Sequence, residues 1–124
     1  MSATGQPTAT VPVDVETMRE TVSAVLNADG GPVLPEPSDD QVLSLIALLR
    51  GHLEVMVREV ETAAGKLPDS ITRFCALACV GEARGKLRAR PAALPGGAVA
   101  YARRLARVLA ALCDHHERMA GEPG

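Results

Sequence analysis

The stretch LCDHHERM, residues 112–119, places a thiol, two carboxylates and two imidazoles in five consecutive positions. Side chains of these types bind metal ions or transfer protons when another part of the chain supplies partners. If the last two predicted helices pack antiparallel, Cys75 and Cys79 lie near Cys113 and His116. These four residues would then make a Cys₃His zinc site.

Core packing is the alternative for the same residues, and it is the one that we expect. No CxxC pair occurs in the chain, and free cysteines are among the most often buried residues. We therefore predict no metal site and no cofactor. The helical register directs Cys113 and His116 inward, and His115 and Glu117 outward.

His52 and His116 are the residues that we single out for a catalytic role. His52 follows Gly51 in the middle of a predicted helix, where glycine costs about 1 kcal/mol relative to alanine. Close contact with a neighbouring helix is the simplest reason for this glycine, and His52 could act as a base beside that contact. A structural histidine is the alternative. The chain holds no GxSxG, HExxH or phosphate-loop motif, so no enzyme class that depends on them is indicated.

Basic residues cluster on both sides of the segment RPAALPGG, residues 90–97. Antiparallel packing of the flanking helices would bring them to one end of the molecule. We predict that Arg84, Arg88, Arg103 and Arg107 form a patch that faces a partner, either an acidic protein or a phosphorylated small molecule.

The uneven charge of the chain offers an intramolecular role for the same arginines. Residues 1–62 hold three basic and ten acidic residues, a net charge of −7, and residues 63–124 hold ten basic and five acidic residues, a net charge of +5. The two halves would attract each other within one fold. Nucleic acid is not an expected partner, because the net charge is −2 and Phe74 and Tyr101 are the only aromatic residues.

The elements that must position these residues are helices, because apolar residues recur at helical spacing and no period-two alternation is evident. Helices are predicted over residues 15–27, between Ser38 and Gly65, over 70–89 and over 98–119. The fold class is all-α, a compact, mostly antiparallel four-helix bundle over residues 14–119, with disordered tails over 1–13 and 120–124.

Helix starts are marked by side chains that can accept backbone hydrogen bonds. Asp14 is the expected N-cap of the first helix, and Ser38 with Gln41 forms a capping box for the second. Asp69 or Ser70 caps the third. The predicted core face of the third helix is Ile71, Phe74, Cys75, Ala78 and Leu87, and that of the fourth is Val99, Ala102, Leu105, Leu109, Leu112, His116 and Met119.

The segment VLSLIALL, residues 42–49, has six large aliphatic residues in eight positions, too many for one stripe. Such a helix is either central in the monomer or half of a subunit interface. We expect a homodimer in which Leu43, Leu45 and Leu48 meet their counterparts, because large exposed apolar patches are uncommon and two-fold association covers them.

Several features of the sequence lead us to expect a cytoplasmic protein. The chain lacks the run of roughly 18 apolar residues that a membrane span needs, and its first residues do not form a signal peptide. Three cysteines without a framework spacing indicate a reducing compartment.

The stretches LRGHLEVMVREVE, CALACVGEAR and ARRLARVLAALCDHHERM resemble a family of small actinobacterial, Streptomyces-type proteins. That family is a domain of unknown function labelled as natural product biosynthesis protein, and the resemblance covers residues 15–119. It implies a helical protein of secondary metabolism. Relatives commonly have tyrosine at the position of His116, so the resemblance weakens the case for His116 as an essential ligand.

Together these features predict a non-catalytic accessory or regulatory binding protein that acts through helix surfaces. The alternative is a small, cyclase-like enzyme with a pocket between helices. A deep pocket with His52 or His116 on its wall would favour the enzyme.

Overall fold

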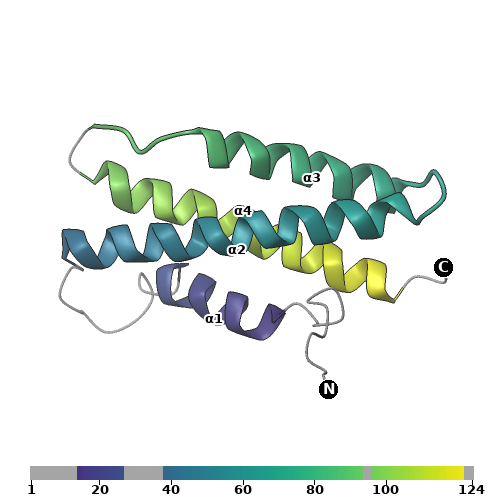
Figure 1. Cartoon of the computed structure of the whole chain (residues 1–124), viewed down its shortest axis with the longest axis horizontal. Helices are drawn as coiled ribbons and strands as arrows, with labels where there is room; N and C mark the ends of the chain where they lie inside the picture. The colour runs from purple at the N-terminus through teal and green to yellow at the C-terminus, as the bar shows by residue number, and fades with distance from the viewer. Residues whose placement is uncertain (1–13, 27–37, 94–95, 122–124) are drawn as a thin grey trace, which may run out of the picture.

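The four predicted helices are all present in a computed structural model, which describes residues 14–26, 38–93 and 96–121. They are α1 (Val15–Leu26), α2 (Asp39–Gly65), α3 (Ile71–Arg88) and α4 (Gly97–Ala120), and no strand occurs among the described residues. Successive helices run in opposite directions and pack as a four-helix bundle (Figure 1), which confirms the all-α prediction. The predicted tail over 1–13 lies outside the described residues, as do residues 122–124 of the tail predicted over 120–124. Ala120 of that predicted tail is instead the last residue of α4.

The helix starts follow the predicted capping chemistry. Asp14 accepts hydrogen bonds from the backbone N–H and the hydroxyl of Thr17, at 3.0 and 2.6 Å. Ser38 and Gln41 exchange the two hydrogen bonds of a capping box, at 3.2 and 2.8 Å. At α3 the cap is Ser70, whose hydroxyl accepts from the backbone N–H of Arg73 at 3.1 Å.

Two helices form the centre of the bundle. α2 and α4 each contact all three other helices, whereas α3 touches only α2 and α4, and α1 touches only the same two. In Figure 1, α3 and α1 lie on opposite sides of the central pair. The outer helices therefore have one face in the core and another face that no helix of the bundle covers.

No helix in the described part of the chain is long and apolar enough to cross a membrane.

α4 supplies the largest part of the core, and its predicted core face is largely confirmed. The residues of that face which are buried are Ala102, Leu105, Leu109, Leu112 and Met119. Val99 and His116 are only half-buried. Tyr101, Ala106, Val108 and Cys113 are buried in addition, because α4 has neighbours on several sides.

The predicted core face of α3 is wrong except at Leu87, which packs against the core. Ile71 and Phe74 are 81% and 73% exposed, Cys75 and Ala78 are exposed, and Leu87 is half-buried. The face that enters the core consists of Ala76, Cys79, Val80 and Ala83. These side chains are small, so the α3 backbone can lie close to α2 and α4 with little apolar bulk between them.

Tyr101 joins three helices at the end of the bundle where α3 passes into α4. Its side chain is 1% exposed, and its hydroxyl accepts a hydrogen bond from Arg50 Nη1 of α2 at 2.6 Å. The same hydroxyl lies 2.9 and 3.0 Å from the carbonyl oxygens of Lys86 and Ala89, between which its single proton is shared. The end of α3 is thereby tied to α2 and α4.

The start of α4 depends on two glycines. Gly96 is the N-cap residue and has a φ of 78°, in the left-handed region that favours glycine. Gly97 is buried, and a Cβ atom there would overlap the backbone carbonyl of Ala92. The loop from α3 can therefore fold back closely against the first turn of α4 only where side chains are absent.

Candidate functional site

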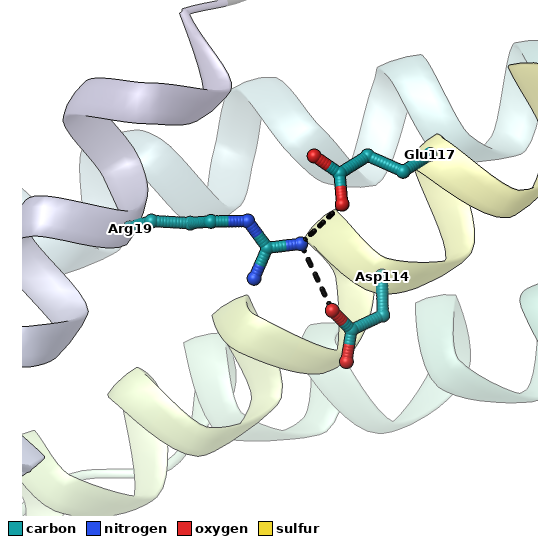
Figure 2. Close-up of polar contacts among 3 residues, drawn as sticks. All are labelled: Arg19, Asp114 and Glu117. Atoms are coloured by element: carbon teal, nitrogen blue, oxygen red, sulfur yellow. Dashed lines mark hydrogen bonds and ion pairs between the residues drawn. The ribbon is translucent and has the colours of Figure 1, made fainter.

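The carboxylates of the C-terminal cluster hold α1 against α4. Arg19 Nη2 donates hydrogen bonds to Asp114 Oδ1 at 2.9 Å and to Glu117 Oε1 at 2.6 Å, as Figure 2 shows. The two carboxylates are three residues apart and therefore lie on one side of α4. The hydrogen bonds that Arg19 donates, first the one to Asp114 and then the one to Glu117, raise the pKa of its guanidinium above the ordinary value. Two of the residues that looked chemically active thus form an ion pair with α1.

The other residues of the cluster are placed only partly as predicted. Cys113 is fully buried and Glu117 is exposed, which confirms their predicted directions. His115 and His116 are both half-buried, so the predicted contrast between them is wrong. Nδ1 of His115 is enclosed without a hydrogen-bond partner among the described residues. Burial, followed by the neighbouring charge of Arg118, lowers the pKa of His115.

The three cysteines do not converge on a metal site. Cys75 is exposed on the outer side of α3, whereas Cys79 and Cys113 are buried. In the described part of the chain, no group of three His, Cys, Asp or Glu residues is arranged to hold a metal ion. Burial raises the pKa of the Cys79 thiol to about 11 and that of Cys113 above its ordinary value. Both thiols therefore stay protonated near neutral pH and are poor nucleophiles.

His52 lies between α2 and α1. Its Nε2 is 3.4 Å from the hydroxyl of Thr21, and burial lowers its pKa while Asp14 acts in the opposite direction. The predicted reason for Gly51 is wrong, because this residue is exposed and a Cβ atom there would have no neighbour within 4 Å. His52 therefore has a contact with α1 and does not stand beside a close crossing of helices.

Two hollows on the surface are lined by residues other than His52 and His116. One, of about 570 Å³, is lined by Asp40, Gln41, Ser44, Leu45 and Leu48 of α2. A second, also of about 570 Å³, is lined by Val15, Glu16, Arg19, Glu20, Ser23 and Glu117. Both are open to solvent, and neither His52 nor His116 is among their described lining residues. A deep pocket with His52 or His116 on its wall would favour an enzyme, and neither of these two hollows is such a pocket.

The four arginines of the predicted basic patch differ in their exposure and in their ion pairing. Arg84 is paired with Glu61 of α2 through two hydrogen bonds of 3.0 and 2.8 Å, and this pair lowers the pKa of the Glu61 carboxyl. Arg103 is half-buried, whereas Arg88 and Arg107 are exposed. The intramolecular role that the charge distribution offered applies to Arg84. For Arg88 and Arg107 the partner-facing role stays a prediction.

Large apolar side chains are exposed on two helices. On α2, Leu43 and Leu48 are 57% and 47% exposed, while Leu45 is half-buried and packs against the core. On α3, Ile71 and Phe74 are the most exposed large hydrophobic residues of the described chain. The α2 leucines were singled out from the sequence as a dimer interface, which stays a prediction, whereas the α3 pair was assigned to the core.

A sequence signal for the α3 surface was present. Ile71 and Phe74 begin a series with alternating spacings of three and four residues that continues as Ala78, Gly81, Gly85 and Arg88. This spacing is that of a coiled-coil seam. Its two glycines interrupt the run of apolar side chains, so a search for large apolar residues does not find the series.

The comparisons with known proteins give a family without an assigned activity. A model for a family of unknown function, DUF6415, matches residues 16–121 of the chain. No curated protein and no solved structure matches the chain.

Proposed function

We infer that this chain, which belongs to the DUF6415 family of unknown function, is a non-catalytic accessory or regulatory protein that acts by binding through its helix surfaces. The observation that carries this proposal is the exposure of large apolar side chains on α2 and α3. Large apolar side chains that are left in solvent close together, as Ile71 and Phe74 are in the first turns of α3, mark sites of interaction when they form a patch. A pocket enzyme would have His52 or His116 on the wall of its pocket, and neither of the two hollows described above is lined by either residue.

Self-association is part of the proposal, because a second copy is the commonest cover for an apolar helix face. The sequence-based interface of Leu43, Leu45 and Leu48 is one candidate for it. The exposure of Leu43 and Leu48 supports this candidate, and the half-buried position of Leu45 reduces what it can contribute.

The proposed partner is an acidic protein that binds through exposed arginines of α3 and α4. Arg88 and Arg107 are exposed and carry the positive charge that such a partner needs. A phosphorylated small molecule would need a concave site, and neither of the two hollows described above is lined by these arginines. An extended acidic surface therefore fits them better.

The proposed setting is the cytoplasm of an actinobacterium, in a pathway of natural product biosynthesis. The motifs that resemble the Streptomyces-type family support this setting. The three free thiols, two of them buried, support a reducing compartment.

Binding to a poly-glutamate peptide and to inorganic pyrophosphate, measured by calorimetry at two salt concentrations, tests the partner class. We expect peptide binding that weakens with salt and is lost when Arg88→Glu and Arg107→Glu are combined. Arg58→Glu combined with Arg73→Glu makes the same change of charge away from the proposed surface and serves as the control. An equal loss in the control, or binding of pyrophosphate alone, would contradict an acidic protein partner.

The cyclase-like alternative is tested in a strain whose metabolite yield falls when the gene is deleted. We expect His52→Ala and His116→Ala to restore the yield as well as the wild-type gene does. The combined Arg88→Glu and Arg107→Glu variant should not restore it. If folded histidine variants fail while the arginine variant succeeds, the protein is an enzyme and the binding proposal is wrong.

A further inference from the structure

The outer face of α3 carries a complete seam of coiled-coil spacing. Its positions follow one another at intervals of three, four, three, four and three residues, which keeps them on one side of a helix. Five of the six are exposed and Gly85 is half-buried. The α3 seam consists of Ile71, Phe74, Ala78, Gly81, Gly85 and Arg88.

Side-chain size decreases steeply along the apolar part of the α3 seam. Ile71 and Phe74 are large side chains that protrude from the first turns of the helix. Ala78 is small, and Gly81 and Gly85 have no side chain. A Cβ atom at either glycine would have no neighbour within 4 Å, so these glycines are not required by the packing of the monomer. They leave room for side chains of another molecule to approach the α3 backbone.

We propose that the α3 seam is the two-fold interface of a homodimer in which α3 pairs antiparallel with α3 of a second copy. Antiparallel pairing at this spacing forms three kinds of layer, each present twice. Phe74 lies over Gly85 of the second copy, Ala78 over Gly81, and Ile71 over the aliphatic stem of Arg88. Every layer combines a larger side chain with a smaller or flexible one, so the surface is complementary to itself.

The charges near the two ends of α3 also favour a second copy of the chain as the partner, and they favour antiparallel pairing. Asp69, just before the start of α3, is fully exposed and forms an ion pair with Arg73 of that helix at 3.1 Å, and Arg88 and Arg90 are exposed at the end of α3. The antiparallel register brings Asp69 to the level of Arg88 and Arg90 of the second copy at both ends of the seam. It also sets the positive end of each helix dipole beside the negative end of the other.

A parallel pair would lose both kinds of complementarity. Phe74 would face Phe74, the glycines would face glycines across a gap, and like charges would meet at each end. The direction of pairing is therefore determined by the distribution of bulk and charge along the α3 seam.

This inference rests on the self-association in the proposed function and assigns its surface. Sedimentation velocity over a range of concentrations should give a species of twice the 12.9 kDa chain mass. Phe74→Glu should raise the dissociation constant by about tenfold or more, because it places a charge in the two layers where Phe74 lies over Gly85. Leu48→Glu makes the same change on α2 and should leave it unchanged. Thermal unfolding of both variants checks that the fold is retained.

Exchange of bulk within one layer tests the register. Phe74→Ala and Gly85→Phe should each weaken the dimer, and the two combined in one chain should restore it, because the large-to-small layer is rebuilt in reverse. With Cys75→Ser as background, chains bearing Ala78→Cys should form disulfides with chains bearing Gly81→Cys. Chains bearing Ala78→Cys alone should do so far less.

The outcomes separate this inference from the proposed function. If Leu48→Glu dissociates the dimer and Phe74→Glu does not, the α3 seam is wrong and the α2 leucines are the interface. Cross-linking of Ala78→Cys to itself in preference to Gly81→Cys would overturn the antiparallel direction. A wild-type monomer at all accessible concentrations overturns the dimer. Binding of an acidic partner is still decided by Arg107→Glu alone in the peptide experiment, because Arg107 is exposed and lies outside the α3 seam.

Discussion

α3 and α4 are adjacent antiparallel helices with opposite distributions of apolar bulk. α4 directs its large residues inward, and Leu105, Leu109 and Leu112 are fully buried. α3 directs Ile71 and Phe74 to solvent, its fully buried residues are small or medium, and Leu77 and Leu87 are half-buried against the core. The two helices were assigned core faces by the same rule, and the rule was right for one of them.

The difference shows that side-chain size does not by itself identify the buried face of an outer helix. A helix at the edge of a bundle has two possible uses for an apolar face, contact with its own bundle or contact with another molecule. In α3 the face of Ala76, Cys79, Val80 and Ala83 serves the first use. Its small residues allow close approach, and the larger residues remain for the second use.

The largest expected effect in this comparison is at the centre of α4. Leu109→Ala should lower the free energy of unfolding by about 2–5 kcal/mol, because it removes a fully buried side chain and leaves a cavity. Phe74→Ala on α3 should change it by about 0.5 kcal/mol or less when measured on the monomer. Urea unfolding at low protein concentration compares the two. A larger loss for Phe74→Ala would show that α3 buries Phe74 after all.

The junction between the two helices should be sensitive to one methyl group. Gly97→Ala should destabilise the fold by about 1–3 kcal/mol, because the Cβ atom overlaps the carbonyl of Ala92. Gly51→Ala, on the exposed side of α2, should instead stabilise it by about 0.5–1 kcal/mol through helix propensity. Thermal melts of both variants report opposite shifts of Tm. Equal shifts in the same direction would contradict the different surroundings of the two glycines.

The tie between α3 and α4 is tested by removing one hydroxyl. Tyr101→Phe should cost about 1–2 kcal/mol of unfolding free energy, because Arg50 and the carbonyls of Lys86 and Ala89 lose their common partner. Hydrogen exchange should increase most in the last turn of α3. An increase spread evenly over all helices would show that the hydroxyl stabilises the whole fold and not this junction.

The ion pair between α1 and α4 should contribute less. Arg19→Ala should lower the free energy of unfolding by about 0.2–1 kcal/mol, because Arg19, Asp114 and Glu117 are all partly exposed. The loss should shrink in high salt. Arg58→Ala, which removes another exposed arginine, is the control. A loss that does not change with salt would indicate packing of the arginine stem and not its charge.

The smallest expected effect is a dependence of stability on pH that arises from His52 and His115. Burial lowers the pKa of both imidazoles in the folded state, so the unfolded chain takes up protons first as the pH falls. Stability is therefore complete above the ordinary histidine pKa of about 6.5 and decreases as the pH falls below it. Urea unfolding at several pH values between neutral and mildly acidic measures the decrease. His52→Gln combined with His115→Gln should flatten this part of the curve.

The sequence by itself determined the helices of this protein and their starts. Asp14, Ser38 with Gln41, and Ser70 act on backbone groups within a few residues, so local chemistry is sufficient to place them. The core face of α4 was also predictable, because its periodic large residues fit a helix with neighbours on several sides. The capping residues and the face of α4 therefore agree between sequence and structure.

Only the tertiary structure decided what the polar and outer residues do. Asp114 and Glu117 are ion-pair partners because α1, far away in the sequence, brings Arg19 to them. Arg84 of α3 binds Glu61 of α2 in the same way. The orientation of α3 followed from how closely its small residues let it approach two neighbours. Such choices depend on the competition between surfaces of different helices, which no local pattern contains. The sequence specifies each surface, and their mutual packing determines which of them stays in solvent.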